Sequence, residues 1–311
     1  MIGKKIKDIS VNKDTSLEEL VGQLHDSGGF VAKKVGIAAN ILENMLSEKD
    51  CYNTLSFPAA IISTGCRGII KDLVRKKLFH MVMTTCGTLD HDFARVWEPY
   101  YHGSFSADDR ALHEKKIHRL GNIFIPFSNY GEIIEKKLRP VLEDIYKSGK
   151  RDLAAYELVW EIGKRLEKEK NKEHSIIWWC WKNQIPVIVP GITDGAFGLQ
   201  LALFMQDHSD FRVDVFRDEK FLIGKFFGDM KTGALIIGGG ISKHHAIWWN
   251  QFKGGLDYAV YITTAVEWDG SLSGARPREA VSWGKINEKA EYVTVEGDAT
   301  ALLPLVVGKF L

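Results

Sequence analysis

The sequence has few cysteines, no long apolar segment and almost no net charge. Its four cysteines show no C-x-x-C spacing, which argues against a disulfide framework and against structural zinc. No apolar run approaches the roughly 20 residues that span a bilayer, and the N-terminus lacks the apolar core of a signal peptide. A formal net charge of +1 gives no general attraction for nucleic acid. These absences predict a cytoplasmic protein that binds neither membrane nor nucleic acid.

The first 48 residues carry a helical pattern. Leucine and valine recur at helical spacing from Leu17, and the pattern breaks at Asp26-Ser27-Gly28-Gly29. A second predicted helix covers Val31–Leu46. We therefore expect an N-terminal helical arm over residues 1–48, ahead of a catalytic domain over residues 49–311.

From Cys51 onward, short apolar runs alternate with helical patterns. The apolar runs are Thr54–Ile62, Met81–Thr85, Asn122–Pro126, Ile185–Pro190, Ala234–Ile237 and Tyr258–Ile262. The predicted helices include Gly65–Lys77 and Leu153–Lys170. Continuous short apolar runs separated by helices are typical of a parallel sheet that is covered on both faces. The pattern predicts an α/β fold: a Rossmann-like, mostly parallel sheet flanked by helices.

Four of the predicted strands end in small or polar residues. The four ends are Thr84–Gly87, Thr193–Gly195, Gly238–Gly240 and Thr264-Ala265. Ligands of parallel sheets bind beyond the carboxyl ends of strands, and a glycine turn before a helix suits a pyrophosphate. Gly238–Gly240 could equally be a turn without a ligand. Because the G-x-G-x-x-G pattern is missing, the chain is not an ordinary Rossmann dehydrogenase.

His244 and His245 open the helix that follows the glycine turn. A metal site is one interpretation, but adjacent helical side chains point about 100° apart and no third ligand stands at a suitable spacing. A hydrogen-bonding or proton-shuttling role is the second interpretation, and a structural cap is the third. We predict no metal.

The stretch from Thr264 to Lys285 is too polar for a core strand and too rich in aromatic residues for an idle loop. Its tryptophans offer faces to a cation or a flat ring, and its carboxylates suit a polyamine. Lys285 follows Trp283-Gly284. A lysine that lies against an indole and is partly desolvated loses its proton more easily and can attack an imine carbon. By itself, this lysine could also be an ordinary surface residue.

Several segments resemble those of deoxyhypusine synthase, in the archaeal form. They are Ser63-Thr64-Gly65, Thr84–His91, Arg119–Asn122, Thr193–Gly195, Gly238–His245, Asp257–Tyr261, Asp269–Lys285, Asp298-Ala299 and Pro304-Leu305. The resemblance covers the chain from about Gly28 to the C-terminus, in the expected order.

The resemblance implies an NAD-dependent aminobutyl transfer. NAD takes a hydride from spermidine, Lys285 captures the aminobutyl group as an imine, and diaminopropane leaves. A lysine of translation initiation factor 5A, in its archaeal form, then displaces Lys285, and the hydride is returned. Family members form homotetramers with active sites at dimer interfaces. The helical arm could cover a neighbour's site, or it could simply pack against its own sheet.

The resemblance also assigns site residues. Positions that match the NAD site are Ser63, Thr85, Cys86, Gly87, Asp194, Gly239, Thr264, Ala265, Asp298 and Ala299. Positions that match the spermidine site are Asp90, His91, His244, Gly270, Ser271, Glu279 and Trp283. In this set His244 would assist proton transfer, Glu279 would hold an ammonium group, and Trp283 would form an apolar wall.

The chain departs from the eukaryotic pattern near the polyamine. Eukaryotic members carry carboxylates at the positions of Leu199 and Leu272, a glutamate at His91, and Ser-Asn at Ala59-Ala60. Nearby acids such as Asp90 could compensate. A second hypothesis is therefore a homospermidine-synthase-like transfer to a free polyamine. A third hypothesis is a non-catalytic NAD-binding protein, which the complete Ser-Trp-Gly-Lys motif disfavours.

Overall fold

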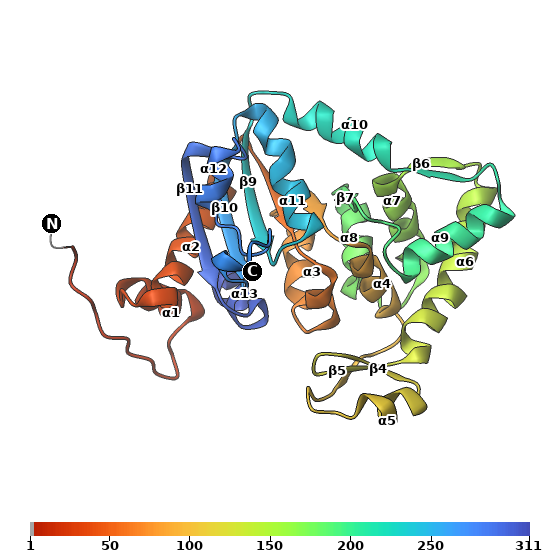
Figure 1. Cartoon of the computed structure of the whole chain (residues 1–311), viewed down its shortest axis with the longest axis horizontal. Coiled ribbons are helices and arrows are strands. Elements are labelled where there is room, and N and C mark those ends of the chain that lie inside the picture. The colour runs from red at the N-terminus through yellow and green to blue at the C-terminus, as the bar shows by residue number, and fades with distance from the viewer. Residues whose placement is uncertain (1–2) are drawn as a thin grey trace. The chain divides into compact units, whose positions relative to one another are not determined.

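The computed structural model describes residues 3–311 and divides into two compact units. Unit 1 comprises the described residues up to Phe57 together with Lys225–Leu311, and unit 2 comprises Pro58–Gly224. Most strand pairs within the units are parallel, and helices pack on them (Figure 1). The predicted α/β fold with a mostly parallel sheet is confirmed.

Unit 1 contains four neighbouring parallel strands in the order β11-β10-β9-β1. Their bounds are β1 (Cys51–Ser56), β9 (Lys231–Ile237), β10 (Leu256–Thr263) and β11 (Ile286–Glu296). Val260 of β10 pairs with Leu235 of β9 and with Val293 of β11. This register brings the carboxyl ends of β9, β10 and β11 to one edge, where parallel sheets bind ligands.

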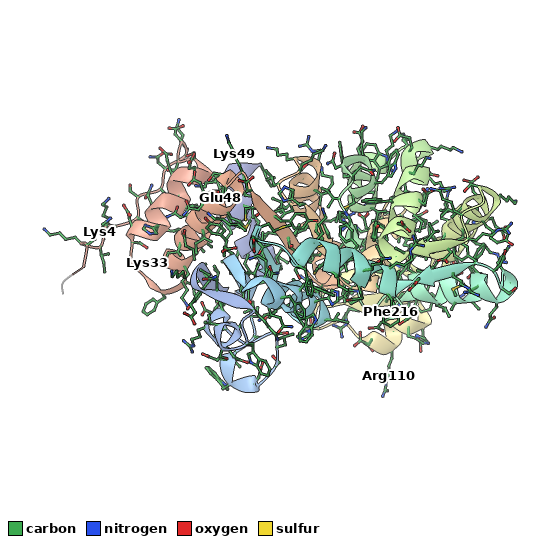
Figure 2. The ribbon with its side chains drawn as sticks, turned by 90° about the horizontal axis from the view of Figure 1, so that it is seen from above. Lys4, Lys33, Glu48, Lys49, Arg110 and Phe216 are labelled. Atoms are coloured by element: carbon green, nitrogen blue, oxygen red, sulfur yellow. The ribbon has the colours of Figure 1, made fainter. Side chains whose placement is uncertain are left out.

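The helices of unit 1 pack on these strands. They are α1 (Leu17–Asp26), α2 (Phe30–Ser47), α11 (Ile241–Trp248), α12 (Pro277–Ser282) and α13 (Ala299–Val307). α1 begins with a capping box, in which the Ser16 hydroxyl accepts from the N–H of Glu19 and the Glu19 carboxylate accepts from the N–H of Ser16. The two predicted N-terminal helices are confirmed, and α2 packs against β10 and β11. Glu48, labelled in Figure 2, follows α2 and accepts a 2.7 Å hydrogen bond from Lys231 at the start of β9.

Unit 2 contains short strands and most of the longer helices. Its strands are β2 (Met81–Met83), β3 (Tyr101–His102), β4 (Ile117–Leu120), β5 (Ile123–Pro126), β6 (Asp152–Ala154), β7 (Val187–Ile188) and β8 (Arg212–Asp214). Its helices are α3 (Arg67–Arg75), α4 (Cys86–Ala94), α5 (Asp109–Glu114), α6 (Gly131–Lys147), α7 (Ala155–Arg165), α8 (Ile176–Asn183) and α9 (Ala196–Asp207). α10 (Val215–Phe226) runs across the boundary between the units.

A buried ion pair joins three helices of unit 2. Arg67 at the start of α3 donates from Nε to Asp92 of α4 at 2.8 Å. The second oxygen of Asp92 accepts from the Ser175 hydroxyl at 2.7 Å and from the N–H of Ile177 at 2.9 Å, at the start of α8. Because every polar atom of the carboxylate is satisfied, its burial is compatible with a stable core.

The structure corrects several predicted elements. The run Thr54–Ile62 is not one strand, because β1 ends at Ser56 and a 3₁₀ turn follows at Ala59–Ser63. The run Asn122–Pro126 contains β5, which pairs antiparallel with β3 and β4. The predicted helix Leu153–Lys170 begins later, because β6 occupies its first residues.

The division into an arm and a catalytic domain stays a prediction. By contacts, α1 and α2 belong to unit 1 together with the C-terminal strands. Within residues 3–311, no helix has both the length and the apolar character needed to cross a bilayer.

Candidate active site

A cavity of about 330 Å³ lies in unit 1, where α11, β10, the loop after β10 and α12 meet. Its lining residues are Lys243, His244, Ile247, Trp248, Tyr261, Leu272, Ala275, Arg276, Glu279, Ala280, Trp283 and Lys285. The structure therefore brings together four residues that the sequence analysis had assigned to catalysis or to polyamine binding: His244, Glu279, Trp283 and Lys285.

Lys285 follows α12 through a turn that favours glycine. Gly284 adopts a φ of +66°. The N–H of Gly284 donates to the carbonyl of Val281, and the N–H of Lys285 donates to that of Ala280, both at 2.9 Å. These two bonds form a Schellman motif, whose left-handed residue is usually glycine. The carbonyl of Lys285 then accepts from the N–H of Leu256 at 3.1 Å, at the start of β10, so its backbone is fixed on both sides.

The amine of Lys285 lies between two indole rings. Its Nζ atom is 5.1 Å from the ring centre of Trp283 and 5.7 Å from that of Trp248. The residue is only 8% exposed. Within residues 3–311, the Nζ atom makes no hydrogen bond or ion pair. An amine that is enclosed by indoles but not hydrogen-bonded remains available to attack a bound electrophile.

His244 lies on α11 and lines the same cavity as Lys285. Its ring stacks on that of Trp248, with ring centres 5.6 Å apart. Burial lowers the pKa of His244, and the positive charge of Lys285 lowers it further. A neutral imidazole in this position can accept a proton from a reacting amine.

His245 lies in a different environment from its neighbour. Its Nε2 atom is 3.2 Å from the indole N–H of Trp249, which donates to it. Burial lowers the pKa of His245 to about 4. Within residues 3–311, no three or more His, Cys, Asp or Glu side chains are grouped as a metal site.

α12 carries the carboxylate of the cavity. The helix begins at Pro277, a residue that suits the first helical position, and Glu279 lies in its first turn. Three cationic residues, Lys243, Arg276 and Lys285, line the same cavity. Glu279 is the one carboxylate among the described residues that line the cavity, so it can pair with a single ammonium group, while the apolar side chains can contact a methylene stem.

Lys243 was missed as a site residue by the sequence analysis. It is 1% exposed, and its Nζ atom donates to the carbonyls of Leu272 and Ala275 at 2.6 and 2.7 Å. Burial lowers the pKa of Lys243 to about 8, and the charge of Arg276 acts in the same direction. A signal existed in the sequence, because Lys243 and Ile247 are four residues apart and so share one face of α11.

The loop before α12 holds two further predicted substrate residues, Gly270 and Ser271. Gly270 has a φ of +70° and follows a short 3₁₀ turn. The N–H of Ser271 donates to Asp269 at 2.7 Å, and the Ser271 hydroxyl accepts from the N–H of Gly274 at 3.2 Å. These bonds shape the loop, and the assignment of Gly270 and Ser271 to the polyamine stays a prediction.

Half of the predicted cofactor residues lie in unit 1, beyond the carboxyl ends of its strands. Gly239 follows β9, Thr264 and Ala265 follow β10, and Asp298 and Ala299 follow β11. Asp298 caps α13 by accepting from the N–H of Thr300 at 2.7 Å. The prediction that Gly239, Thr264 and Ala265 lie at strand ends is confirmed, and β9 and β10 are parallel neighbours. Asp298 and Ala299 follow β11, a strand that the sequence analysis did not predict.

The other predicted cofactor residues lie in unit 2: Ser63, Thr85, Cys86, Gly87 and Asp194. Thr85 accepts through its hydroxyl from the N–H of Ala59 at 3.1 Å. A Cβ on Gly87 would lie 2.8 Å from that of Ala59, so glycine permits this close packing. Burial raises the pKa of the Cys86 thiol to about 12, so Cys86 is not a thiolate nucleophile.

Asp90 of unit 2 has a structural role that the sequence did not suggest. Its carboxylate accepts from the hydroxyl of Tyr130 at 2.6 Å and from the N–H groups of Phe197 and Ala196 at 2.7 and 3.1 Å. Asp90 therefore caps the start of α9, where a negative charge is favourable. Burial raises its pKa, whereas these hydrogen bonds act to lower it.

His91 follows Asp90 on α4 and is also buried. Its Nδ1 atom is 2.9 Å from the hydroxyl of Tyr100. Burial lowers the pKa of His91 to about 4, so the imidazole is neutral at pH 7. The assignments of Asp90 and His91 to the polyamine site stay predictions.

The residues at the strand ends of unit 1 fit a dinucleotide. Gly240 has a φ of +75°, and a Cβ there would meet no atom within 4 Å, so the space above this turn is open. α11 begins directly after it, and the first N–H groups of a helix have no partner within the helix and can bind a phosphate. Gly239 differs, because a Cβ there would lie 2.1 Å from the Ser273 hydroxyl. Glycine at that position permits the loop after β10 to approach.

Comparison with known proteins assigns the family. The family model described as deoxyhypusine synthase matches residues 19–310. The chain belongs to the deoxyhypusine synthase family. This membership implies an enzyme of the transferase class, and it confirms the resemblance that the motifs had carried.

Archaeal members of the deoxyhypusine synthase family match over the full chain. A "Probable deoxyhypusine synthase" of Picrophilus torridus is 51% identical over 311 residues, covering 100% of this chain and 98% of the relative. A protein of the same name from Thermoplasma acidophilum is 50% identical with the same coverage. The crystal structure of a proposed deoxyhypusine synthase from Entamoeba histolytica has a TM-score of 0.67 at 23% identity, covering 98% of this chain and 96% of that one. That likeness supports the fold.

The two leucines that the sequence analysis contrasted with the expected eukaryotic pattern lie in different units. Leu272 lines the cavity beside Lys285. Leu199 lies on α9 in unit 2 and is 57% exposed. An apolar side chain at Leu272 therefore contributes directly to the cavity wall.

Proposed function

We propose that this protein is a deoxyhypusine synthase. It transfers the aminobutyl group of spermidine, through a covalent bond to Lys285, to a lysine of the archaeal homologue of translation initiation factor 5A. The observation that carries the proposal is the position of Lys285, buried between two indoles with an amine that has no hydrogen-bond partner in the described chain. Family membership supports the same reaction.

Lys285 supplies the covalent step. Its Nζ atom attacks the imine carbon of oxidised spermidine, and a carbon–nitrogen bond forms as the bond to 1,3-diaminopropane breaks. The aminobutyl chain then remains on Lys285 as an imine until the lysine of the protein substrate displaces it. This exchange restores the free amine of Lys285.

His244 and the aromatic walls support that step. A neutral His244 accepts the proton that the attacking amine releases and returns it to the leaving diamine. Trp248 and Trp283 line the cavity and offer apolar ring faces to the methylene chain of the donor. Glu279 pairs with the terminal ammonium group of the donor.

The cofactor of the proposed reaction is NAD. When bound, it would take up the hydride of spermidine and later return it to the product. The open turn at Gly240 and the start of α11 would hold its pyrophosphate, and the Asp298 carboxylate would bind a ribose hydroxyl. We also propose that the protein is cytoplasmic and that it forms a homotetramer. Light scattering on the purified protein would test the homotetramer.

Replacement of the nucleophile tests the proposal. Lys285→Arg keeps the positive charge but removes the nucleophilic amine, so we expect transfer to the protein substrate to fall at least 1,000-fold, in line with the loss of a covalent route. NAD binding, measured by quenching of tryptophan fluorescence, should change less than about threefold. Lys289→Arg is the matched control, because Lys289 is exposed on β11 outside the cavity. Transfer close to the wild-type rate in Lys285→Arg would remove the lysine from the mechanism.

A second candidate function keeps the chemistry but changes the acceptor. Leu272 lines the cavity at a position where eukaryotic relatives carry a carboxylate, which favours a homospermidine-synthase-like transfer to a free polyamine. Incubation with labelled spermidine, NAD and equal concentrations of putrescine and the purified factor separates the two. Label that accumulates on the factor supports the proposal, whereas label in homospermidine supports the alternative.

A further inference from the structure

A second lysine of the cavity, Lys243, is arranged in a way that the proposed chemistry does not use. Its ammonium group has three N–H donors. Two of them reach the carbonyls of Leu272 and Ala275 at 2.6 and 2.7 Å. The face of the Tyr261 ring lies 4.4 Å from the same nitrogen and is available to the third.

These contacts leave Lys243 no direction in which to reach a substrate. The residue is 1% exposed, so it does not act as a surface charge either. Burying an ammonium group costs free energy unless its donors are satisfied, and charge-assisted bonds to two carbonyls offset that cost. What the arrangement achieves is a fixed position for the backbone between Leu272 and Ala275.

The same short segment is held at two further points. The Thr263 hydroxyl at the end of β10 donates to the carbonyl of Ser273 at 3.2 Å. Ser273 also packs directly against Gly239, where any Cβ would collide with it. The segment 272–275 is therefore bound to β10, to the glycine turn and, through Lys243, to α11.

The position of this segment decides the position of α12. Arg276 is the N-cap of α12 and directly follows Ala275. α12 has six residues, which is too short to be stable without anchors. It carries Glu279, and the Schellman turn at its end leads to Lys285. The anchor at the start of α12 therefore helps to fix the position of Glu279 in the cavity.

We propose that Lys243 is a positioning residue, whose ammonium group holds the Leu272–Ala275 backbone so that Glu279 and Trp283 face the polyamine donor. The identity of the donor in this inference rests on the proposed function. The claim that Lys243 holds the Leu272–Ala275 backbone does not. Loss of the ammonium group releases the start of α12, whereas Lys285 remains held by its own turn and by β10. The effect of the loss therefore falls on donor binding more than on the covalent step.

The test compares Lys243→Met with Lys253→Met in the full-length protein. Lys253 is a matched control, because its side chain is 5% exposed and donates to the carbonyl of Gly255 at 2.8 Å and to Asp257 at 3.1 Å, outside the cavity. In Lys243→Met we expect KM for spermidine to rise about tenfold and kcat to fall less than about threefold. Lys253→Met should leave both constants within about twofold of wild type. An unchanged KM in folded Lys243→Met overturns the proposal.

Amide hydrogen exchange of residues 272–276 supplies a readout that needs no turnover. We expect exchange in this segment to rise at least tenfold in Lys243→Met but not in Lys253→Met. If wild-type protein reacts with no polyamine, the proposed function fails, while the exchange measurement still decides whether Lys243 holds the loop. If Lys243→Met does not fold, Lys243→Gln carries both measurements, because its amide can still donate to one carbonyl. Unchanged KM and exchange in that variant overturn the inference.

Discussion

At the scale of single residues, the two lysines of the cavity differ in what surrounds their amines. Lys243 donates to two carbonyls and faces a tyrosine ring, so its donors are used. Lys285 faces two indoles, and its Nζ atom makes no hydrogen bond within residues 3–311. Burial lowers the pKa of Lys243 to about 8, yet Lys285 is the amine that can reach a substrate. Accessibility of the lone pair, rather than acidity alone, selects the nucleophile.

The burial of Lys243 predicts how stability changes with pH. Its pKa is about 8 in the folded chain, against an ordinary value of 10.5. Between these values the unfolded chain keeps a proton that the folded chain has released, so the unfolding free energy rises with pH. The rise should reach about 3 kcal/mol above pH 10.5. Urea denaturation of wild type and Lys243→Met between pH 7 and 10.5 measures this rise. The unfolding free energy of wild type minus that of Lys243→Met should increase with pH. A difference that stays constant or shrinks contradicts the desolvated state of this ammonium.

At the scale of elements, α12 is a short helix that depends on what holds its two ends. Lys243 anchors the segment before it, and the Schellman turn at Gly284 joins it to β11. Both anchors act on the backbone at an end of α12. The side chains of Glu279, Trp283 and Lys285 are thereby presented from a rigid path of nine residues, from Pro277 to Lys285.

The turn at Gly284 can be tested with a matched glycine. Gly284 and Gly149 both have positive φ, at +66° and +86°, and a Cβ on either would meet no atom within 4 Å. Gly284→Ala and Gly149→Ala should each lower the unfolding free energy by about 1 kcal/mol, because alanine disfavours the left-handed conformation. Only Gly284→Ala should also reduce transfer, by about tenfold or more, since it displaces Lys285. Equal activity of the two variants at matched stability would show that the turn does not position the nucleophile.

At the scale of the whole molecule, the sequence predicted the parts that depend on local pattern. β9 and β10 were found because strands with neighbours on both sides are continuous apolar runs. β11 was missed because its first half, Asn287–Glu291, is rich in charged residues, as suits a strand at the end of the order. Gly239 and Thr264 were expected at strand ends, whereas Asp298 follows the strand that was missed.

The contacts that the sequence could not show are the long-range ones. Asp90 caps a helix more than 100 positions away in the chain, and nothing near either residue indicates it. Lys243 binds backbone carbonyls, and a carbonyl has no signature in the sequence. The sequence analysis therefore assigned no role to Lys243, although it considered the two histidines that follow. The positions of the remaining site residues rested on the family resemblance.

Trapping of the covalent intermediate tests the central claim most directly. Wild-type protein is incubated with NAD and spermidine, reduced with borohydride, digested and examined by mass spectrometry. We predict that the peptide containing Lys285 gains one aminobutyl group, that the peptide containing Lys243 gains none, and that no adduct forms when NAD is omitted. An adduct on Lys243, or no adduct on any lysine with NAD and spermidine present, would contradict the assignment of Lys285 as the nucleophile.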